Sequence, residues 1–161
     1  MNTKYLPSTI FSTTSLLWSV YGWYNDVYGA GLLVYALMYL LHEAYTSLKK
    51  SDYQYVAHGV ITSSAILFAI FQGQSCYKHV YHVLSIFEFS TPFLNIAKQY
   101  RTKLSYQMFA GTFFSARIVV GTYMYFTTWM YVTYLLSTCL MMLQYYWMLM
   151  ICRKAMELKV K

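Results

Sequence analysis

Four residues that could carry charge or bind polar groups stand inside long apolar stretches: His58, Glu88, Asn95 and Arg117. A histidine can act as a general base, an asparagine both donates and accepts hydrogen bonds, and a glutamate can neutralise an arginine. Because polar groups in apolar surroundings are costly, we take these positions as candidates for a functional site. The candidate set is completed by nearby polar residues and one proline: Ser90, Thr91, Pro92 and Gln144.

Each candidate also has a purely structural explanation. Glu88 and Arg117 could form a structural ion pair with no further role. The hydroxyl groups of Ser90 and Thr91 could bond back to their own helix. His58 could be a packed or interfacial histidine. The residue types alone therefore leave binding, catalysis and structural roles open.

Cysteine and histidine spacing predicts no metal or disulfide framework. His79 and His82 are three residues apart and could share a metal ion, but no third ligand stands nearby. The three cysteines, at positions 76, 139 and 152, have no metal-ligand spacing. We expect no metal and no tightly bound cofactor.

The composition predicts a membrane protein. Hydrophobic residues make up 58% of the 161 residues and charged residues 11%, whereas soluble domains carry about 25% charged residues. Since about 20 apolar residues cross the hydrocarbon core as a helix, the charge-poor runs predict helical spans. We predict one all-α integral membrane domain, residues 1–161, with six transmembrane helices near 8–24, 27–47, 53–72, 77–98, 104–125 and 128–152. A tight turn near 122–128 is expected between the last two spans.

The distribution of basic residues predicts the topology. Ten of the twelve Lys and Arg residues fall on one side of the six predicted spans, Lys78 falls on the other, and Arg117 lies within a span. By the positive-inside rule, both termini are cytoplasmic. His42 and Glu43 are expected to mark the cytoplasmic end of the second span. The net charge of +7 is better explained by this topology than by nucleic-acid binding, so no nucleic-acid partner is predicted.

The candidate residues should lie in the cytoplasmic half of the membrane or near its midplane. At about 1.5 Å per helical residue, His58 lies roughly 8 Å, Glu88 roughly 15 Å and Arg117 roughly 20 Å from the cytoplasmic ends of their spans. Pro92 removes a backbone hydrogen bond, so we expect it to kink or break the fourth span. A broken helix at this depth is tolerated where it lines a cavity.

The segment Glu88 to Asn95, E-F-S-T-P-F-L-N, resembles the E-x-S-T-P-F-x-N signature of the TLC domain family. That family includes the ceramide synthases, the translocating-chain-associated proteins and TLC domain-containing proteins of lipid homeostasis. Three weaker segments resemble other family motifs, in the family's order: Asp52 to His58, Phe113 to Ile118, and Gln144 to Trp147 followed by Ile151. The resemblance implies a lipid-related membrane protein of the endoplasmic reticulum.

The chain departs from the ceramide synthases at positions that matter for chemistry. Their histidine pair is implicated in acyl transfer, but Ala57 stands at its first position here and leaves only His58. Gln144 replaces an asparagine of the final motif, and an H-D-x-S-D-like segment is missing at Glu88 to Thr91. The resemblance is therefore to the branch without synthase activity.

Three functional hypotheses remain. In the first, the protein binds, senses or moves an acyl lipid (a sphingolipid, phospholipid or acyl-CoA) in a cavity bounded by the third to sixth predicted spans, and so affects membrane lipid composition. In the second, it is an acyl-CoA-dependent acyltransferase related to ceramide synthase, with His58 as general base and acyl-CoA as co-substrate. In the third, it scaffolds other membrane proteins. The sequence ranks the first highest because of Ala57, and leaves the oligomeric state open.

Overall fold

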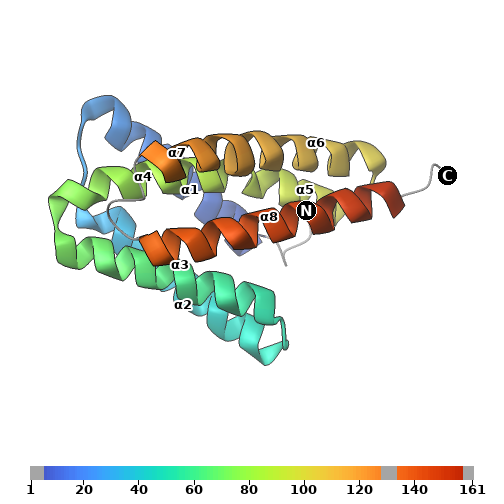
Figure 1. Ribbon diagram of the computed structural model, residues 1–161, viewed down its shortest axis with the longest axis horizontal. Coiled ribbons are helices and arrows are strands. Elements are labelled where there is room, and N and C mark those ends of the chain that lie inside the picture. The colour runs from blue at the N-terminus through green and yellow to red at the C-terminus, as the bar shows by residue number, and fades with distance from the viewer. Residues whose placement is uncertain (1–5, 128–133, 158–161) are drawn as a thin grey trace.

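The computed structural model describes residues 6–127 and 134–157, and all regular structure in this part of the chain is helical. Figure 1 shows α8 running lengthwise beside α3 and α6, against which it packs. The helices are α1 (Leu6–Asn25), α2 (Ala30–Lys49), α3 (Tyr53–Gln72), α4 (Gln74–Phe89), α5 (Thr91–Tyr100), α6 (Lys103–Phe113), the π-helix η2 (Phe114–Val120), α7 (Gly121–Thr127) and α8 (Tyr134–Glu157).

The observed helices follow the charge-poor runs of the sequence. α3 has the bounds predicted for the third span, while α1 and α2 are each shifted by a few residues. Two helical segments, Tyr53–Gln72 and Leu135–Met156, are long and apolar enough to cross a membrane on their own. The all-helical class is confirmed, whereas the six-span topology stays a prediction.

Two details of the predicted spans differ from the structure. The fourth predicted span consists of two helices, α4 and α5, which meet at Ser90, two residues before Pro92. Ser90 has helical dihedral angles (φ −84°, ψ −15°), so a kink at Pro92 itself stays a prediction. The tight turn predicted near 122–128 is wrong for residues 122–127, because α7 is helical there. The sequence around it lacks the proline that ends helices most reliably.

Two glycines set the packing of the helices that carry the site. Gly73 alone separates α3 from α4 and has φ 83°, in the left-handed region that favours glycine. Gly59 lets α2 and α3 approach closely, because a methyl group there would lie 2.8 Å from Ala44 Cβ and 3.0 Å from the Leu40 carbonyl oxygen. This contact brings the C-terminal half of α2 beside the first turns of α3.

Buried side chains form three clusters along the molecule. The largest joins α1, α2, α3 and α4 and includes Phe11, Leu40 and Tyr81. A second joins α4 to α8 around Phe87, and a third joins α5, α6 and η2 around Phe109. Many large apolar residues remain exposed on the outside, which is expected where lipid is the solvent.

Candidate binding pocket

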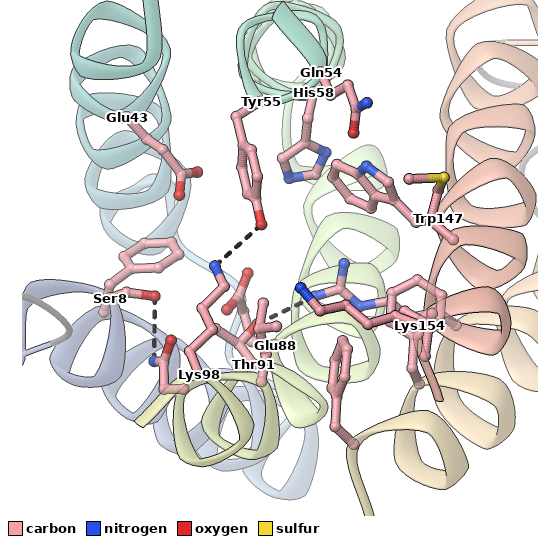
Figure 2. A pocket seen from close by; sticks show the side chains of 18 of the residues that line it. Ser8, Glu43, Gln54, Tyr55, His58, Glu88, Thr91, Lys98, Trp147 and Lys154 are labelled. Carbon is pink, nitrogen blue, oxygen red and sulfur yellow. Dashed lines mark hydrogen bonds between the residues drawn. The ribbon is translucent and has the colours of Figure 1, made fainter. Parts of the chain in front are cut away.

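A pocket of about 580 Å³ lies between the first and third apolar clusters. It is walled by residues of α1, α2, α3, α4, α5, α6, η2 and α8, so its shape depends on the whole fold. Phe11 and Leu40 contribute from the first cluster, and Phe109 and Phe113 from the third. Figure 2 shows polar side chains from several helices pointing into the same space.

Seven of the eight sequence-predicted residues lie in the pocket wall or directly behind it. The structure brings five of them together in the pocket wall: His58, Glu88, Thr91, Asn95 and Arg117. Ser90 and Gln144 lie behind the wall, both with 0% exposure, and bind Arg117. Pro92 is not part of the wall and begins α5. The candidate set thus describes one region of the fold.

Arg117 is the centre of a buried hydrogen-bond network. Its Nε atom donates to Ser90 Oγ at 2.7 Å, and Nη1 donates to Gln144 Oε1 at 3.4 Å. Its Nη2 atom donates to the Phe87 carbonyl oxygen at 2.6 Å and to Thr91 Oγ1 at 3.1 Å. The guanidinium therefore joins η2 to α8 and to α4 and α5, the two helices that meet at Ser90.

Local backbone geometry presents Arg117 to these partners. Residues Phe114–Val120 form a π-helix inside what would otherwise be one continuous helix with α6 and α7. π-helical turns are rare and often occur at functional sites. The guanidinium carbon also lies 5.5 Å from the ring centroid of Phe87 and 5.2 Å from that of Phe113, so aromatic faces cover the cation.

The structure contradicts a direct Glu88–Arg117 ion pair. Among the described residues, the ion pair within 4.0 Å joins Lys78 and Asp26, on exposed side chains away from the pocket. The Oε2 atom of Glu88 is buried and has no hydrogen-bond partner there. Arg117 is instead satisfied by the neutral oxygens of its network, so the two charged groups share the pocket without a direct contact.

His58 lies in the pocket wall without an acidic partner. Its Nδ1 atom is 3.4 Å from Thr62 Oγ1, one helical turn further along α3. Its ring centroid lies 5.1 Å from that of Trp147 on α8. This arrangement packs and orients the imidazole, but within residues 6–127 and 134–157 no carboxylate holds it in the manner of a catalytic dyad.

Asn95 connects two helices at the pocket wall. Its Nδ2 atom donates to Thr9 Oγ1 at 2.9 Å and to Ser8 Oγ at 3.4 Å, which ties α5 to the start of α1. Sequence analysis found Asn95 but could not identify its partners, because Ser8 and Thr9 are more than 80 residues away in the chain.

Several residues of the pocket were not found by sequence analysis. Glu43 was assigned to a helix end, yet α2 continues to Lys49 and Glu43 lines the pocket. The available signal was a carboxylate one turn inside an otherwise apolar span. Other missed lining residues are aromatic or basic: Tyr39, Tyr55, Tyr106, Trp147, Lys98, Arg153 and Lys154.

Neither metal-ligand clusters nor paired histidines appear near the pocket. In residues 6–127 and 134–157, no three His, Cys, Asp or Glu side chains are grouped so as to hold a metal ion. His82 packs its ring against Trp23, with centroids 5.9 Å apart, outside the pocket.

The sequence is similar to those of known proteins. The model of the TLC domain matches residues 2–153, which is most of the chain. The chain belongs to the TLC domain family. A protein named as TLC domain-containing, from Acanthamoeba polyphaga mimivirus, is 33% identical over 109 residues, which cover 61% of this chain. The aligned part spans 54%, or about half, of that relative's length. No solved structure matches the chain significantly.

Membership of the TLC domain family confirms the resemblance seen in the sequence. Together with the two long apolar helices, it indicates a membrane protein whose function is related to membrane lipids.

Proposed function

We propose that this TLC-domain protein binds an acyl lipid in the pocket and, by binding, sensing or moving it, affects membrane lipid composition. The observation that carries the proposal is the pocket itself, whose wall combines charged groups with aromatic and aliphatic side chains. Small-molecule sites have the same character and measure roughly 300–1,000 Å³. The volume suits a headgroup or part of one chain, so the rest of a two-chain lipid would remain in the bilayer.

The proposed orientation places the pocket mouth at the cytoplasmic face. We infer six transmembrane segments, with α4 and α5 forming one and α6, η2 and α7 another, and with both termini cytoplasmic. The distribution of basic residues supports this orientation, since Lys98 and Lys154 lie in the last turns of α5 and α8 and line the pocket. Family membership favours the endoplasmic reticulum as the location.

A pocket-filling substitution tests lipid binding. Leu94 lines the pocket, so Leu94→Trp should exclude ligand, whereas Leu67→Trp places the same side chain at an exposed position of α3. Each protein is purified in mild detergent and analysed by native mass spectrometry for retained lipid. Because overpacking costs about 1–3 kcal/mol, retention should fall by about tenfold or more in Leu94→Trp and stay unchanged in Leu67→Trp. Absence of lipid from the wild type would refute the proposal and favour a scaffolding role.

The second candidate function is acyl transfer from acyl-CoA to a lipid acceptor. The observation in its favour is the position of His58 in the pocket wall, where its imidazole could accept a proton from an amine or hydroxyl group. Basic residues at the mouth would attract CoA phosphates as well as lipid headgroups. Transfer of labelled acyl groups to sphingoid or lysolipid acceptors in proteoliposomes would establish it.

A further inference from the structure

The pocket carries both signs of charge on groups that do not pair with each other. Glu43 of α2 and Glu88 of α4 line it together with Lys98 of α5 and Lys154 of α8. Across the described residues, no lysine or arginine nitrogen lies within 4.0 Å of either carboxylate. Figure 2 shows all four side chains extending into the same space. The pocket is therefore prepared for a ligand that supplies the missing partners.

One oxygen atom of the Glu88 carboxylate lacks a hydrogen-bond donor among the described residues. The Oε2 atom of Glu88 is buried and unpaired within the described part of the chain, which is costly in a medium of low dielectric constant. Arg117 does not supply the donor, because its nitrogens bind neutral oxygen atoms of four other residues. Lys98 does not either, because no ion pair within 4.0 Å joins it to Glu88 among the described residues, and its Nζ atom donates to the Tyr55 hydroxyl group at 3.2 Å.

The lysine side of the pocket has spare donors. A lysine ammonium has three N–H groups, and the contact with Tyr55 uses one of those on Lys98. The Nζ atom of Lys154 lies 6.0 Å from the centre of the Tyr106 ring. Both lysines are point charges of the kind that bind phosphate. Apolar lining residues such as Leu94 and Ile151 lie in the same wall and could contact an acyl chain.

We propose that the pocket selects a lipid whose headgroup carries a primary ammonium group and a phosphate. Glu88, assisted by Glu43, binds the ammonium, and Lys98 with Lys154 binds the phosphate. This inference rests on the proposed lipid-binding function and names the headgroup class of its ligand.

The unpaired oxygen of Glu88 distinguishes a primary ammonium from a quaternary one. Aromatic side chains in the wall, Tyr39, Tyr55 and Trp147, could hold either cation through their ring faces. A quaternary ammonium has no N–H group, so it would leave Glu88 Oε2 without a hydrogen bond. A primary ammonium removes that penalty, and the pocket should therefore prefer ethanolamine-type over choline-type headgroups.

The preference can be measured on the full chain in mild detergent. Lysophosphatidylethanolamine and lysophosphatidylcholine with the same acyl chain are titrated by native mass spectrometry, alongside free phosphoethanolamine and phosphocholine. A charge-assisted hydrogen bond to a buried group is worth about tenfold or more in affinity, so the ethanolamine lysolipid should bind about tenfold more tightly than the choline lysolipid. Free phosphoethanolamine should bind more weakly than its lysolipid, because it lacks the chain.

Three substitutions assign the preference to the carboxylates. Glu88→Gln keeps the size of the side chain and should reduce the preference to less than about threefold. Glu43→Gln should also reduce the preference for the ethanolamine lysolipid. It provides a second test if Glu88→Gln does not fold. Asp26→Asn makes the same chemical change outside the pocket, on a side chain that is 80% exposed, and should leave the preference intact. Asparagine also tolerates the positive φ of 53° at that position.

The possible outcomes separate this inference from the function on which it rests. Equal binding of both lysolipids by the wild type would overturn the ammonium assignment while leaving lipid binding in place. A preference that survives both Glu88→Gln and Glu43→Gln would also overturn it. Equally tight binding of free phosphoethanolamine would show that the ligand is not a lipid, and binding of neither lysolipid would refute the lipid-binding function itself.

Discussion

The Nη2 atom of Arg117 lies 2.6 Å from the carbonyl oxygen of Phe87, so a side chain from the π-helix caps the last turn of α4. The final carbonyl groups of a helix have no partner within it, and in lipid no water replaces one. A cation is also favoured at a helix C-terminus by the helix dipole. The same guanidinium binds Ser90 and Thr91, where α4 gives way to α5. Arg117 thus binds the residues that connect α4 to α5 beside the pocket.

Removal of Arg117 should destabilise the fold strongly. Arg117→Met removes the charged donor from the Phe87 carbonyl group and from the side chains of Ser90 and Gln144 in a buried environment. The Ser90 hydroxyl group still donates to the Phe87 carbonyl oxygen at 3.4 Å. Each buried acceptor that loses its donor costs about 1–3 kcal/mol. We expect a marked fall in the midpoint of thermal unfolding, measured in detergent.

A surface substitution provides the control for this experiment. Lys103→Met removes a positive charge at the exposed start of α6 and should change stability by no more than about 0.5 kcal/mol. A double-mutant cycle between Arg117→Met and Ser90→Ala should give a coupling energy of about 1.5–3 kcal/mol, as for hydrogen bonds to charged groups. Independent, additive losses would contradict the network.

A methyl group at Gly59 should push α2 and α3 apart. Gly59→Ala places a Cβ atom 2.8 Å from Ala44 Cβ, and overpacking of this kind costs about 1–3 kcal/mol. Since Glu43 and His58 flank this contact, lipid retention should fall together with thermal stability. The control is Gly111→Ala in α6, where the added methyl group meets nothing within 4 Å. Alanine favours helix by about 1 kcal/mol, so the control should be neutral or slightly stabilising.

Sequence analysis located the helices because charge-poor runs near 20 residues long are themselves the physical requirement for a membrane helix. This explains why α3 has the predicted bounds. The turn predicted near 122–128 was wrong for residues 122–127, because the uniform hydropathy there does not indicate where a helix ends, and residue 128 lies outside the described residues. No distinctive residue type marks the π-helix at Phe114–Val120 in the sequence. The partners of Arg117 lie in other helices, so the sequence of this segment does not show them.

The candidate site was found in part for a similar reason. A buried polar residue is conspicuous in an apolar run, so His58, Glu88 and Arg117 could be selected from the sequence. The pairing of Glu88 with Arg117 was wrong, because similar depth does not determine which neutral oxygens are closer. Glu43 was overlooked because a carboxylate near a predicted helix end has an ordinary explanation at the interface, and only packing against α3 brings it to the pocket.

The proposed topology predicts that Lys78 and the C-terminal part of α8 lie on opposite sides of the membrane. The three native cysteines are replaced first, and single cysteines are then introduced at Lys78 and at Lys50. In sealed vesicles, an impermeant thiol reagent should label the cysteine at position 50 from one side and the cysteine at position 78 from the other. A cysteine in a C-terminal tag should be labelled from the same side as position 50. Labelling of positions 78 and 50 from the same side would rule out six spans.

The last prediction concerns the role of His58 in the pocket. If His58 were a general base, His58→Ala would lower acyl transfer by about 10²–10⁴-fold without affecting lipid retention. We expect the other result: the wild type transfers no labelled acyl group from acyl-CoA in proteoliposomes, and His58→Ala alters which lipid is retained. The physical reason is that His58 bonds to Thr62 and packs on Trp147, with no carboxylate to orient it, while Ala57 removes a neighbouring histidine.

His79→Ala provides the matched control, because His79 lies on α4 outside the pocket and its loss should leave the retained lipid unchanged. Robust acyl transfer by the wild type and the His79→Ala variant, abolished by His58→Ala, would reverse the ranking. A side chain that orients lipid and one that moves a proton would touch the same ligand in this pocket. Turnover distinguishes them, because removal of the side chain that moves a proton lowers the rate of acyl transfer, whereas removal of one that orients lipid changes which lipid is retained.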